Sequence, residues 1–380
     1  MASVRFLQTS DWQLGMTRHF LRPEAQARYT AARIDAIHAM AGLAGKHACD
    51  FVVVAGDVFE SNLIASQTIR RAMQALAEMP CPVYLLPGNH DPLDAASVYD
   101  TDTFTACCPE NVVVLRQPGP YVVSAGVEIL AAPWATKNVL GDLAARALSG
   151  CEADGTVRLL LAHGIVDVLS PDPNDVSMLH LEAMEQALGK RIIHHVALGD
   201  RHSRLSVGVS GRVWYSGSPE VTSFVEDAPG EVLIVEMDSA GGHTVQSEQV
   251  GTWSFVDLRR HVDTSADLEA LQHELAGLRP ADRTVVRTAL TGTLRLADKA
   301  RLEQILAEAD DLFAGRFTWD RHEDLAVIID EAELGDLGVG GFASQAAQEL
   351  AELAAGSGEQ AVCARDALSL LYRLAGGGVR

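Results

Sequence analysis

Five short polar motifs, each placed directly after an apolar run of strand-forming residues, constrain this chain more than any other feature. They are SDWQLG (10–15), GDVFE (56–60), GNHD (88–91), AHG (162–164) and GDRH (199–202). Singly, each motif has an ordinary explanation, because an Asp after a strand usually caps a turn and a lone His is usually structural. In open α/β sheets, however, the loops beyond the carboxyl ends of the strands line one crevice. The ordered set therefore indicates a single metal-binding crevice.

The pattern of apolar runs predicts a layered α/β sandwich over residues 1–250. Short β-branched runs such as VRFLQT, FVVVAG and PVYLLPG alternate with helical stretches, which is typical of parallel strands with crossover helices. After residue 110 the strands follow one another closely, and this predicts a second sheet packed on the first. The glycine-rich DSAGGH (238–243) predicts a hairpin, and we expect the domain to end near residue 250.

Two smaller parts are predicted beyond this boundary. Alternating strand and helix patterns over 251–335 predict a small α+β domain, and 336–380 is predicted to be a tail of two short helices. Residues 331–362 contain six acidic and no basic residues. The helices show apolar residues at helical spacing, which predicts packing on the parent domain or docking of a partner. These apolar residues are Phe342, Ala346, Leu350 and Leu353 in the first helix, and Leu368, Leu371 and Leu374 in the second.

Length and composition favour an ordinary globular protein of two domains. A chain of 380 residues exceeds what one core usually serves, and 48% hydrophobic with 21% charged residues argues against disorder. Neither a signal-like N-terminus nor an apolar run of membrane-spanning length is evident, so we expect a cytoplasmic protein without membrane contact. The six cysteines form no CxxC pair, which predicts reduced structural thiols.

The charge distribution argues against bulk electrostatic binding to nucleic acid but leaves room for a local basic face. The net charge is −21, yet residues 1–46 carry +3 and residues 190–212 carry +4. These basic islands flank the first and the last motif. Their arginines therefore either face a phosphate-binding crevice or are solvated and paired with acids elsewhere. The candidates for phosphate contact are Arg18, Arg22, Arg201 and Arg204.

The amino-acid sequences of the motifs resemble those of a known family. TSDWQLG, VAGDVFE, PGNHD and the turn SGSPE (216–220) are similar to the calcineurin-like metallophosphoesterases. Within that superfamily they resemble the SbcD-like exonuclease subunits of the double-strand-break repair nucleases. The resemblance implies an α/β/β/α sandwich that hydrolyses DNA with two metal ions in DNA repair, acting as exonuclease or endonuclease. It also implies an SMC-like coiled-coil ATPase partner (SbcC-like), a homodimer, and a DNA-facing cap after residue 250.

Carried over position by position, the resemblance implies two sets of metal ligands that share one carboxylate. They are Asp11, Gln13, Asp57 and His202 for one ion, and Asp57, Asn89, His163 and Asp200 for the other. His90 would face the scissile phosphate and act in catalysis by donating a proton to the leaving oxygen. Glu60 falls where related enzymes place a group that orients this histidine.

Two positions depart from the family pattern. Gln13 and Asp200 each stand where the family has a histidine. Both replacements offer an oxygen donor, so the predicted site is richer in hard ligands, which favours manganese(II) or magnesium over zinc. Two alternatives to a DNA nuclease stay open. One is a phosphoesterase for nucleotides or other small esters, and the other is a scaffold subunit that has lost catalysis.

Overall fold

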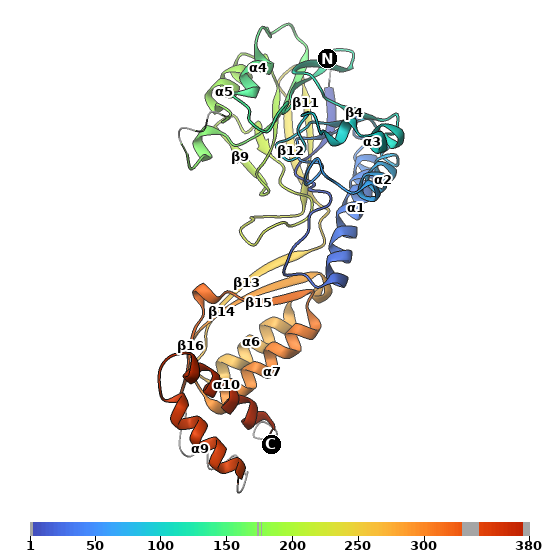
Figure 1. Cartoon of the computed structure of the whole chain (residues 1–380). Coiled ribbons are helices and arrows are strands. Elements are labelled where there is room, and N and C mark those ends of the chain that lie inside the picture. Colours follow the sequence, from blue (N-terminus) through green and yellow to red (C-terminus); the bar gives the residue numbers. More distant parts are fainter. Residues whose placement is uncertain (1–2, 173–174, 176, 329–341, 375–380) are drawn as a thin grey trace. The chain divides into compact units, whose positions relative to one another are not determined.

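The computed structural model describes residues 3–172, 175, 177–328 and 342–374 of the chain (Figure 1). These residues belong to two compact units. The first comprises Met1–Arg18 and Gln26–Trp253, and the second comprises His19–Ala25 and Ser254–Arg380. The boundary predicted at 335 lies outside the described residues. Within the described ranges, no helix has both the length and the apolarity that crossing a bilayer requires.

The first sheet of the first unit has the strand order β12-β11-β1-β2-β3-β4. Strands β1 to β4 run parallel, while β11 pairs antiparallel with β1 and β12 antiparallel with β11. The β11–β12 pair is the hairpin that DSAGGH predicts. The bounds are β1 (Ser3–Thr9), β2 (Phe51–Val54), β3 (Val83–Leu85), β4 (Val112–Val114), β11 (Glu231–Asp238) and β12 (His243–Gln249).

The second sheet has the order β5-β6-β7-β8-β10-β9. Its four inner strands are parallel, and the edge strands β5 and β9 are antiparallel to their neighbours. The bounds are β5 (Gly119–Ser124), β6 (Val127–Ala132), β7 (Val157–His163), β8 (His195–Gly199), β9 (Leu205–Val207) and β10 (Val213–Tyr215).

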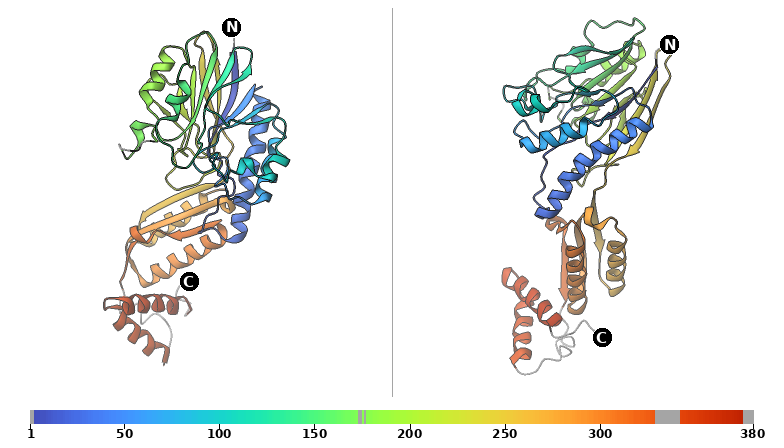
Figure 2. Two further views of the ribbon diagram at one scale, coloured as in Figure 1. Left: turned by 45° about the horizontal axis from the view of Figure 1, so that its top comes forward. Right: turned by 90° about the vertical axis from the view of Figure 1, so that its right-hand side faces the viewer.

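The two sheets pack face to face, and helices cover their outer faces (Figures 1 and 2). Side chains alternate along a strand, so Phe51 and Val53 of β2 enter the core between the sheets while Val52 and Val54 face the helices. Burying each such side chain contributes roughly 1.5–3 kcal/mol. The helices are α1 (Pro23–Lys46), α2 (Ser66–Leu76) and α3 (Asp102–Cys107) on the first sheet, and α4 (Leu143–Leu148) and α5 (Leu181–Gly189) on the second, with 3₁₀ turns at Val98–Asp100 and Asp167–Leu169. The predicted α/β/β/α sandwich is confirmed.

The second unit is a parallel sheet with two helices on one face. Strands β13, β14 and β15 lie in that order, and β16 pairs with the far part of β14. Thr264 and Asp267 form a reciprocal capping box that starts the first helix. The elements are β13 (Ser254–His261), α6 (Ser265–Gly277), a 3₁₀ turn (Ala281–Arg283), β14 (Thr284–Arg295), α7 (Leu296–Leu312), β15 (Gly315–Thr318), a 3₁₀ turn (Asp320–His322) and β16 (Asp324–Ile328).

The predicted tail forms α9 (Phe342–Ala354) and α10 (Glu359–Leu374), which pack on each other and on α7. The residues that face inward agree in part with the predicted apolar series. In α9 the buried residues are Ala347 and Ala354, whereas Phe342 is 87% and Leu353 is 52% exposed. Leu350 of the predicted series packs against the same core as these alanines, so the series is wrong only for Phe342 and Leu353. In α10, Leu368 is buried and Leu371 packs beside it as predicted, whereas Leu374 is 77% exposed.

Candidate metal centre

The predicted ligands lie at the carboxyl ends of strands from both sheets of the sandwich. The loops after β1 and β2 are joined by backbone hydrogen bonds, in which the amides of Asp11 and Gln13 donate to the carbonyls of Gly56 and Asp57, each at 3.0 Å. The placements are Asp11 and Gln13 after β1, Asp57 after β2, Asn89 after β3, His163 at the end of β7, and Asp200 and His202 after β8.

Asp11, Asp57 and His163 form the centre of this group. All three are buried, and their ligand atoms lie within 4.8 Å of one another. His163 Nδ1 is 2.8 Å from the carbonyl oxygen of Ala55, which accepts a hydrogen bond and cannot donate one. In the neutral ring the proton is therefore on Nδ1, and Nε2 presents its lone pair to the carboxylates.

Three more predicted ligands contact these carboxylates. Gln13 Nε2 donates to Asp57 Oδ2 at 3.0 Å, while Gln13 Oε1 is buried and has no partner among the described residues. His202 Nε2 lies 3.8 Å from Asp11 Oδ1, and the backbone amide of Asp200 donates to the same oxygen at 3.0 Å. The amide nitrogen of Gln13 therefore has a hydrogen-bond acceptor, whereas the amide oxygen has no donor among the described residues.

Asn89 completes a group of converging lone pairs. Its inward amide atom lies 2.8 Å from His163 Nε2 and 3.1 and 3.2 Å from the two carboxylate oxygens of Asp57. With the amide oxygen inward and His163 Nε2 unprotonated, only acceptors surround it, and a bound cation would satisfy them. With the nitrogen inward, the amide would donate to the same three atoms. A bound cation would favour the first orientation.

The backbone at the site is strained. Asp11, Gln13, Asp57 and Asp200 have positive φ angles of 53°, 49°, 55° and 94°. Such conformations are uncommon for residues with a β-carbon and cost about 1–3 kcal/mol each. The surrounding hydrogen bonds hold the loops in this conformation, and it aims their side chains at one point.

Glycines allow the loops to approach one another as the sequence predicts. A β-carbon on Gly199 would lie 1.9 Å from the carbonyl oxygen of Ala55, and one on Gly88 would lie 2.2 Å from Asp57 Oδ1. Neither position has room for a side chain. The close packing of these loops therefore depends on glycine at both places.

The electrostatics of the centre favour positive charge. Burial raises the pKa of Asp11 and of Asp200 above the ordinary carboxyl value. Burial also acts to raise the pKa of Asp57, but the charge and hydrogen bond of His163 outweigh it and lower that pKa. Burial acts to lower the pKa of His163, but the three carboxylates outweigh it and raise that pKa well above its usual value. Two buried carboxylates and the half-buried Asp200 at one point are stabilised by a cation.

His90 lies at the edge of the group, with a side chain that is 41% exposed. Its backbone amide donates to Asp57 Oδ1 at 3.0 Å, and its Nε2 is 4.0 Å from Asp57 Oδ2. Its Nδ1 is 2.9 Å from the backbone carbonyl oxygen of Glu60. Glu60, the residue predicted to orient this histidine, thus contacts the ring through its backbone carbonyl.

Arg18 and Arg201 are the predicted arginines next to the centre. Arg18 donates to the carbonyl oxygen of Thr222, whose hydroxyl contacts His202. The Nε atom of Arg18 is buried with no partner in the part of the chain described. Arg201 is exposed and follows Asp200 directly. Arg18 is therefore half-buried and engaged with Thr222, whereas the exposed Arg201 is accessible to an anion.

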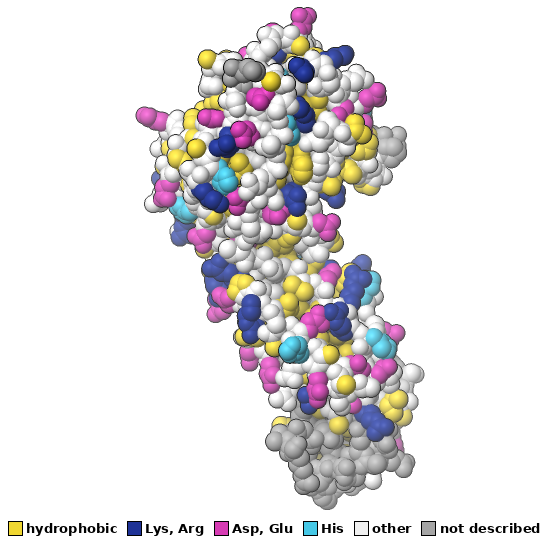
Figure 3. Space-filling model, turned by 180° about the vertical axis from the view of Figure 1, so that it is seen from behind, with side chains coloured by type: hydrophobic (Ala, Val, Ile, Leu, Met, Phe, Trp, Pro, Cys, Tyr) yellow, Lys and Arg dark blue, Asp and Glu magenta, His cyan; other side chains and the backbone are white. Residues whose placement is uncertain are grey.

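The other basic residues are engaged or lie elsewhere. Arg204 forms an ion pair with Glu231, and Arg5 pairs with Glu236 at 3.1 Å. Arg22 is exposed and belongs to the second unit. On the face shown in Figure 3, Lys and Arg side chains alternate with Asp and Glu. Some arginines of the two basic segments are therefore paired with acidic residues, as one of the two alternatives for these segments predicts.

Asp91, the last residue of GNHD, is a functional neighbour that the sequence reasoning missed. It is fully buried and accepts hydrogen bonds from the amides of Gly88 and Phe59 at 2.8 and 3.0 Å and from the hydroxyl of Tyr99 at 2.7 Å. Burial, with the nearby Asp57 charge, raises its pKa to about 6. Asp91 ties the loop after β3 to the loop after β2. An acid directly after the Asn-His pair is the signal that points to this role.

Comparison with known proteins identifies the family. The calcineurin-like phosphoesterase family matches residues 4–247 of the chain. The chain belongs to this family. Its members are metal-dependent hydrolases, and the match covers all five motif loops. No curated protein matches the chain significantly.

Several solved structures are similar to this phosphoesterase at low identity. TT1561 of Thermus thermophilus has 12% identity and a TM-score of 0.43, over 66% of this chain and all of that one. A dimetal phosphatase from Danio rerio has 11% identity and a TM-score of 0.40, over 65% of this chain and 99% of that one. A 5'-nucleotidase precursor from Thermus thermophilus has 14% identity and a TM-score of 0.36, over 65% and 54% of the two chains.

The residues of this phosphoesterase fit a divalent cation. Asp11, Asp57 and His163 offer converging ligand atoms, as the 4.8 Å spacing shows. Gln13 Oε1 is a buried acceptor without a donor among the described residues, and Asn89 faces acceptors alone when its oxygen points inward. Unsatisfied buried acceptors are costly, and bound divalent ions would satisfy them.

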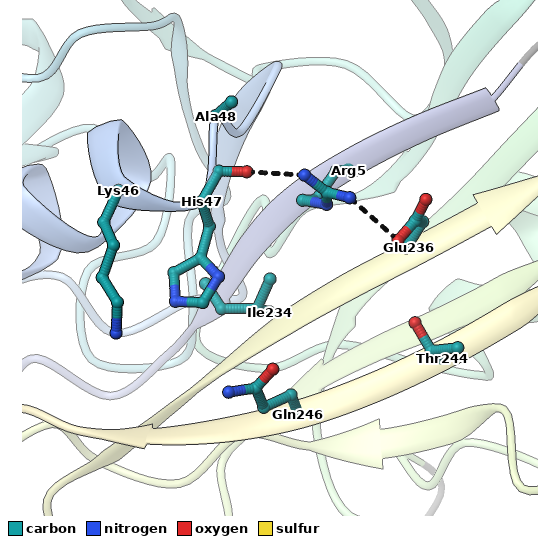
Figure 4. Close-up of a pocket in the computed structure, with 8 residues that line it drawn as sticks. All are labelled: Arg5, Lys46, His47, Ala48, Ile234, Glu236, Thr244 and Gln246. Atoms are coloured by element: carbon teal, nitrogen blue, oxygen red, sulfur yellow. Dashed lines mark hydrogen bonds and ion pairs between the residues drawn. The ribbon is translucent and has the colours of Figure 1, made fainter.

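A second concavity in the phosphoesterase unit carries no such ligand set among its described lining residues. It has a volume of about 310 Å³ and lies by the N-terminal part of β1, whereas Asp11 follows the other end of that strand (Figure 4). Its charged groups already satisfy one another, because Arg5 bonds Glu236 and the carbonyl of His47, and His47 bonds Glu248. Its lining residues are Arg5, Lys46, His47, Ala48, Ile234, Glu236, Thr244 and Gln246.

Proposed function

We propose that this phosphoesterase is a two-metal-dependent DNA nuclease that acts in DNA repair. The observation that carries the hydrolytic part is the convergence of Asp11, Asp57 and His163 within 4.8 Å, with the orphaned Gln13 Oε1 beside them. DNA is proposed as the substrate because the motifs TSDWQLG, VAGDVFE and PGNHD are similar in sequence to those of SbcD-like nucleases. Arg18 and Arg201 next to the centre supply positive charge for a phosphate backbone.

In this proposal two ions share Asp57. The remaining ligands are Asp11, Gln13 and His202 for one, and Asn89, His163 and Asp200 for the other. Bound divalent ions supply a water-derived nucleophile at neutral pH and stabilise negative charge on phosphate oxygens. Five of the seven ligands offer oxygen and two offer nitrogen, so manganese(II) or magnesium suits the set better than zinc.

His90, when both of its ring nitrogens carry a proton, serves as the proton donor to the leaving oxygen. The carbonyl of Glu60 holds Nδ1, and this leaves Nε2 as the atom that faces the site near Asp57. The 41% exposure of the side chain gives a substrate access to that atom. His90 thus contributes to turnover without contributing to metal affinity.

The same proposal includes an SMC-like coiled-coil ATPase subunit as partner, a homodimer and a cytoplasmic location. Support for a docking helix comes from the tail. The helices α9 and α10 keep large apolar side chains outside their shared core, and an amphipathic partner helix buries such side chains. These exposed residues are Phe342, Leu353, Val362, Leu370 and Leu374. Co-purification with the ATPase subunit, lost on Phe342→Glu with Leu353→Glu, tests this part.

Nuclease activity is tested with end-labelled duplex and single-stranded DNA. The purified chain, stripped with chelator, is assayed with manganese, magnesium or zinc at equal free concentrations, alongside nucleoside monophosphates and p-nitrophenyl esters. We expect manganese-dependent release of nucleotides that Asp57→Asn abolishes. Activity confined to the small esters would favour the phosphomonoesterase alternative. Inertness on every substrate, with tight binding of the ATPase subunit, would favour the scaffold alternative.

A further inference from the structure

Glu226 is a buried carboxylate behind the metal centre that no motif contains. Its side chain is 4% exposed and lies in the loop between β10 and β11. The backbone amide of Thr222 donates to it at 3.0 Å, and the hydroxyl of Thr222 donates to its Oε1. The same Oε1 lies 3.4 Å from His202 Nδ1. A buried charge of this kind is costly unless it is paired, so its partners identify its role.

The contacts form a relay that fixes the ring of His202. Because the Thr222 hydroxyl gives its proton to Glu226, its oxygen accepts from His202 Nδ1, 2.5 Å away. The ring proton is therefore on Nδ1, and in the neutral ring Nε2 carries the lone pair. Nε2 is the atom that lies 3.8 Å from Asp11 Oδ1, on the side of the metal centre.

The two histidines of the centre are supported differently. His163 Nδ1 bonds the neutral carbonyl of Ala55, whereas His202 is supported by a full negative charge through Thr222. Each predicted ligand set contains two carboxylates, one amide and one histidine. The carboxylate behind His202 is therefore the feature that distinguishes the two sets.

We propose that Glu226 is a positioning residue that orients His202 and strengthens it as a ligand, so that the ion shared with Gln13 is retained. A carboxylate behind a metal-binding histidine fixes its tautomer and raises its basicity. The proposal rests on the proposed function, since it needs two ions in this centre. It predicts that Glu226 strengthens the binding of the ion held by His202 and does not affect the binding of the other.

Metal binding itself tests the proposal. Manganese is titrated into the chelator-stripped chain and followed by calorimetry and by the manganese spin-resonance signal. We expect two ions in the wild type. Glu226→Gln keeps the size of the side chain and its acceptor for Thr222 but removes the charge. We expect this variant to bind one ion about 10- to 100-fold more weakly and to bind the other with unchanged affinity.

The chain offers a matched control. His47 Nε2 bonds Glu248 at 2.7 Å beside the concavity of Figure 4, so Glu248→Gln removes a carboxylate from a histidine away from the centre. We expect Glu248→Gln to bind both ions as the wild type does. Thr222→Ser keeps the relay and should retain both ions, whereas Thr222→Val breaks it and should lose the same ion as Glu226→Gln. Thermal unfolding of each chelator-treated variant shows that the fold persists.

Each outcome decides a different claim. Wild-type affinity for both ions in Glu226→Gln overturns the proposal, while the proposed function stands. An equal loss of both ions, or a loss in Thr222→Ser as large as in Thr222→Val, shows that Glu226 only holds the loop and also overturns it. A wild-type chain that binds no ions overturns the proposed function itself.

Discussion

Replacement of Gly88 by alanine should disable the metal centre through one steric contact. The added β-carbon would lie 2.2 Å from Asp57 Oδ1 and 2.5 Å from the backbone nitrogen of Asp57. Real contacts of a β-carbon stay beyond 3.0 Å, so the carboxylate must move by at least 0.8 Å. Gly88 is not among the residues with positive φ, so alanine suits its backbone and the effect is steric alone.

The expected magnitudes follow from this displacement. Forcing one extra carbon into a packed site costs about 1–3 kcal/mol of stability. Metal–ligand distances stay within about 0.2 Å of their ideal values, so a shift of 0.8 Å in the shared carboxylate should weaken the binding of both ions. A misplacement near 1 Å also lowers turnover by about 100-fold.

The assay compares Gly88→Ala with Gly42→Ala. Gly42 lies within α1, and a β-carbon there meets no atom within 4 Å. Alanine at position 42 should therefore stabilise the chain by about 0.5–1 kcal/mol and leave metal binding intact. Unfolding in urea and calorimetric titration with manganese measure both effects. Wild-type manganese affinity in Gly88→Ala would refute the argument that this loop and Asp57 are packed as described.

Three further predictions concern metals and pH. Asp57→Asn should abolish metal binding, whereas His90→Ala should keep both ions and lose turnover; loss of ions from the His90 variant would contradict this division. Manganese should compete successfully with zinc at equal free concentration, and a clear zinc preference would contradict the oxygen-rich ligand set. Burial lowers the pKa of His195 well below its usual value and that of His243 to about 4. The unfolded chain then binds more protons below pH 6.5, so stability should fall with acidification. The fall is about 1.5 kcal/mol between pH 6.5 and 5 for His243, and His195 acts in the same direction. Urea unfolding across this range should show a shallower fall in His243→Gln, and an unchanged slope would speak against the neutral pair.

The sequence predicted the layers and the candidate ligands because both are written in local patterns. Strand β2, FVVV, is buried on both faces, as an uninterrupted β-branched run indicates. The motif residues follow strand ends, and parallel strands bring those ends together, so Asp11 and His163 could be placed in one crevice from their positions alone. Trp12, within the first motif, is 1% exposed and packs in the core.

The tertiary structure decided which groups support that crevice, because their partners are distant in sequence and leave no periodic signal. His195 bonds His243 and Gln8 between the two sheets, each at 2.8 Å, although 48 and 187 residues separate them. Residues such as Glu226 and Asp91 acquire a role only when loops from separate strands meet. The order of residues along the chain thus determined which atoms can bind a cation, whereas burial and the contacts between loops decided how those atoms are oriented and charged.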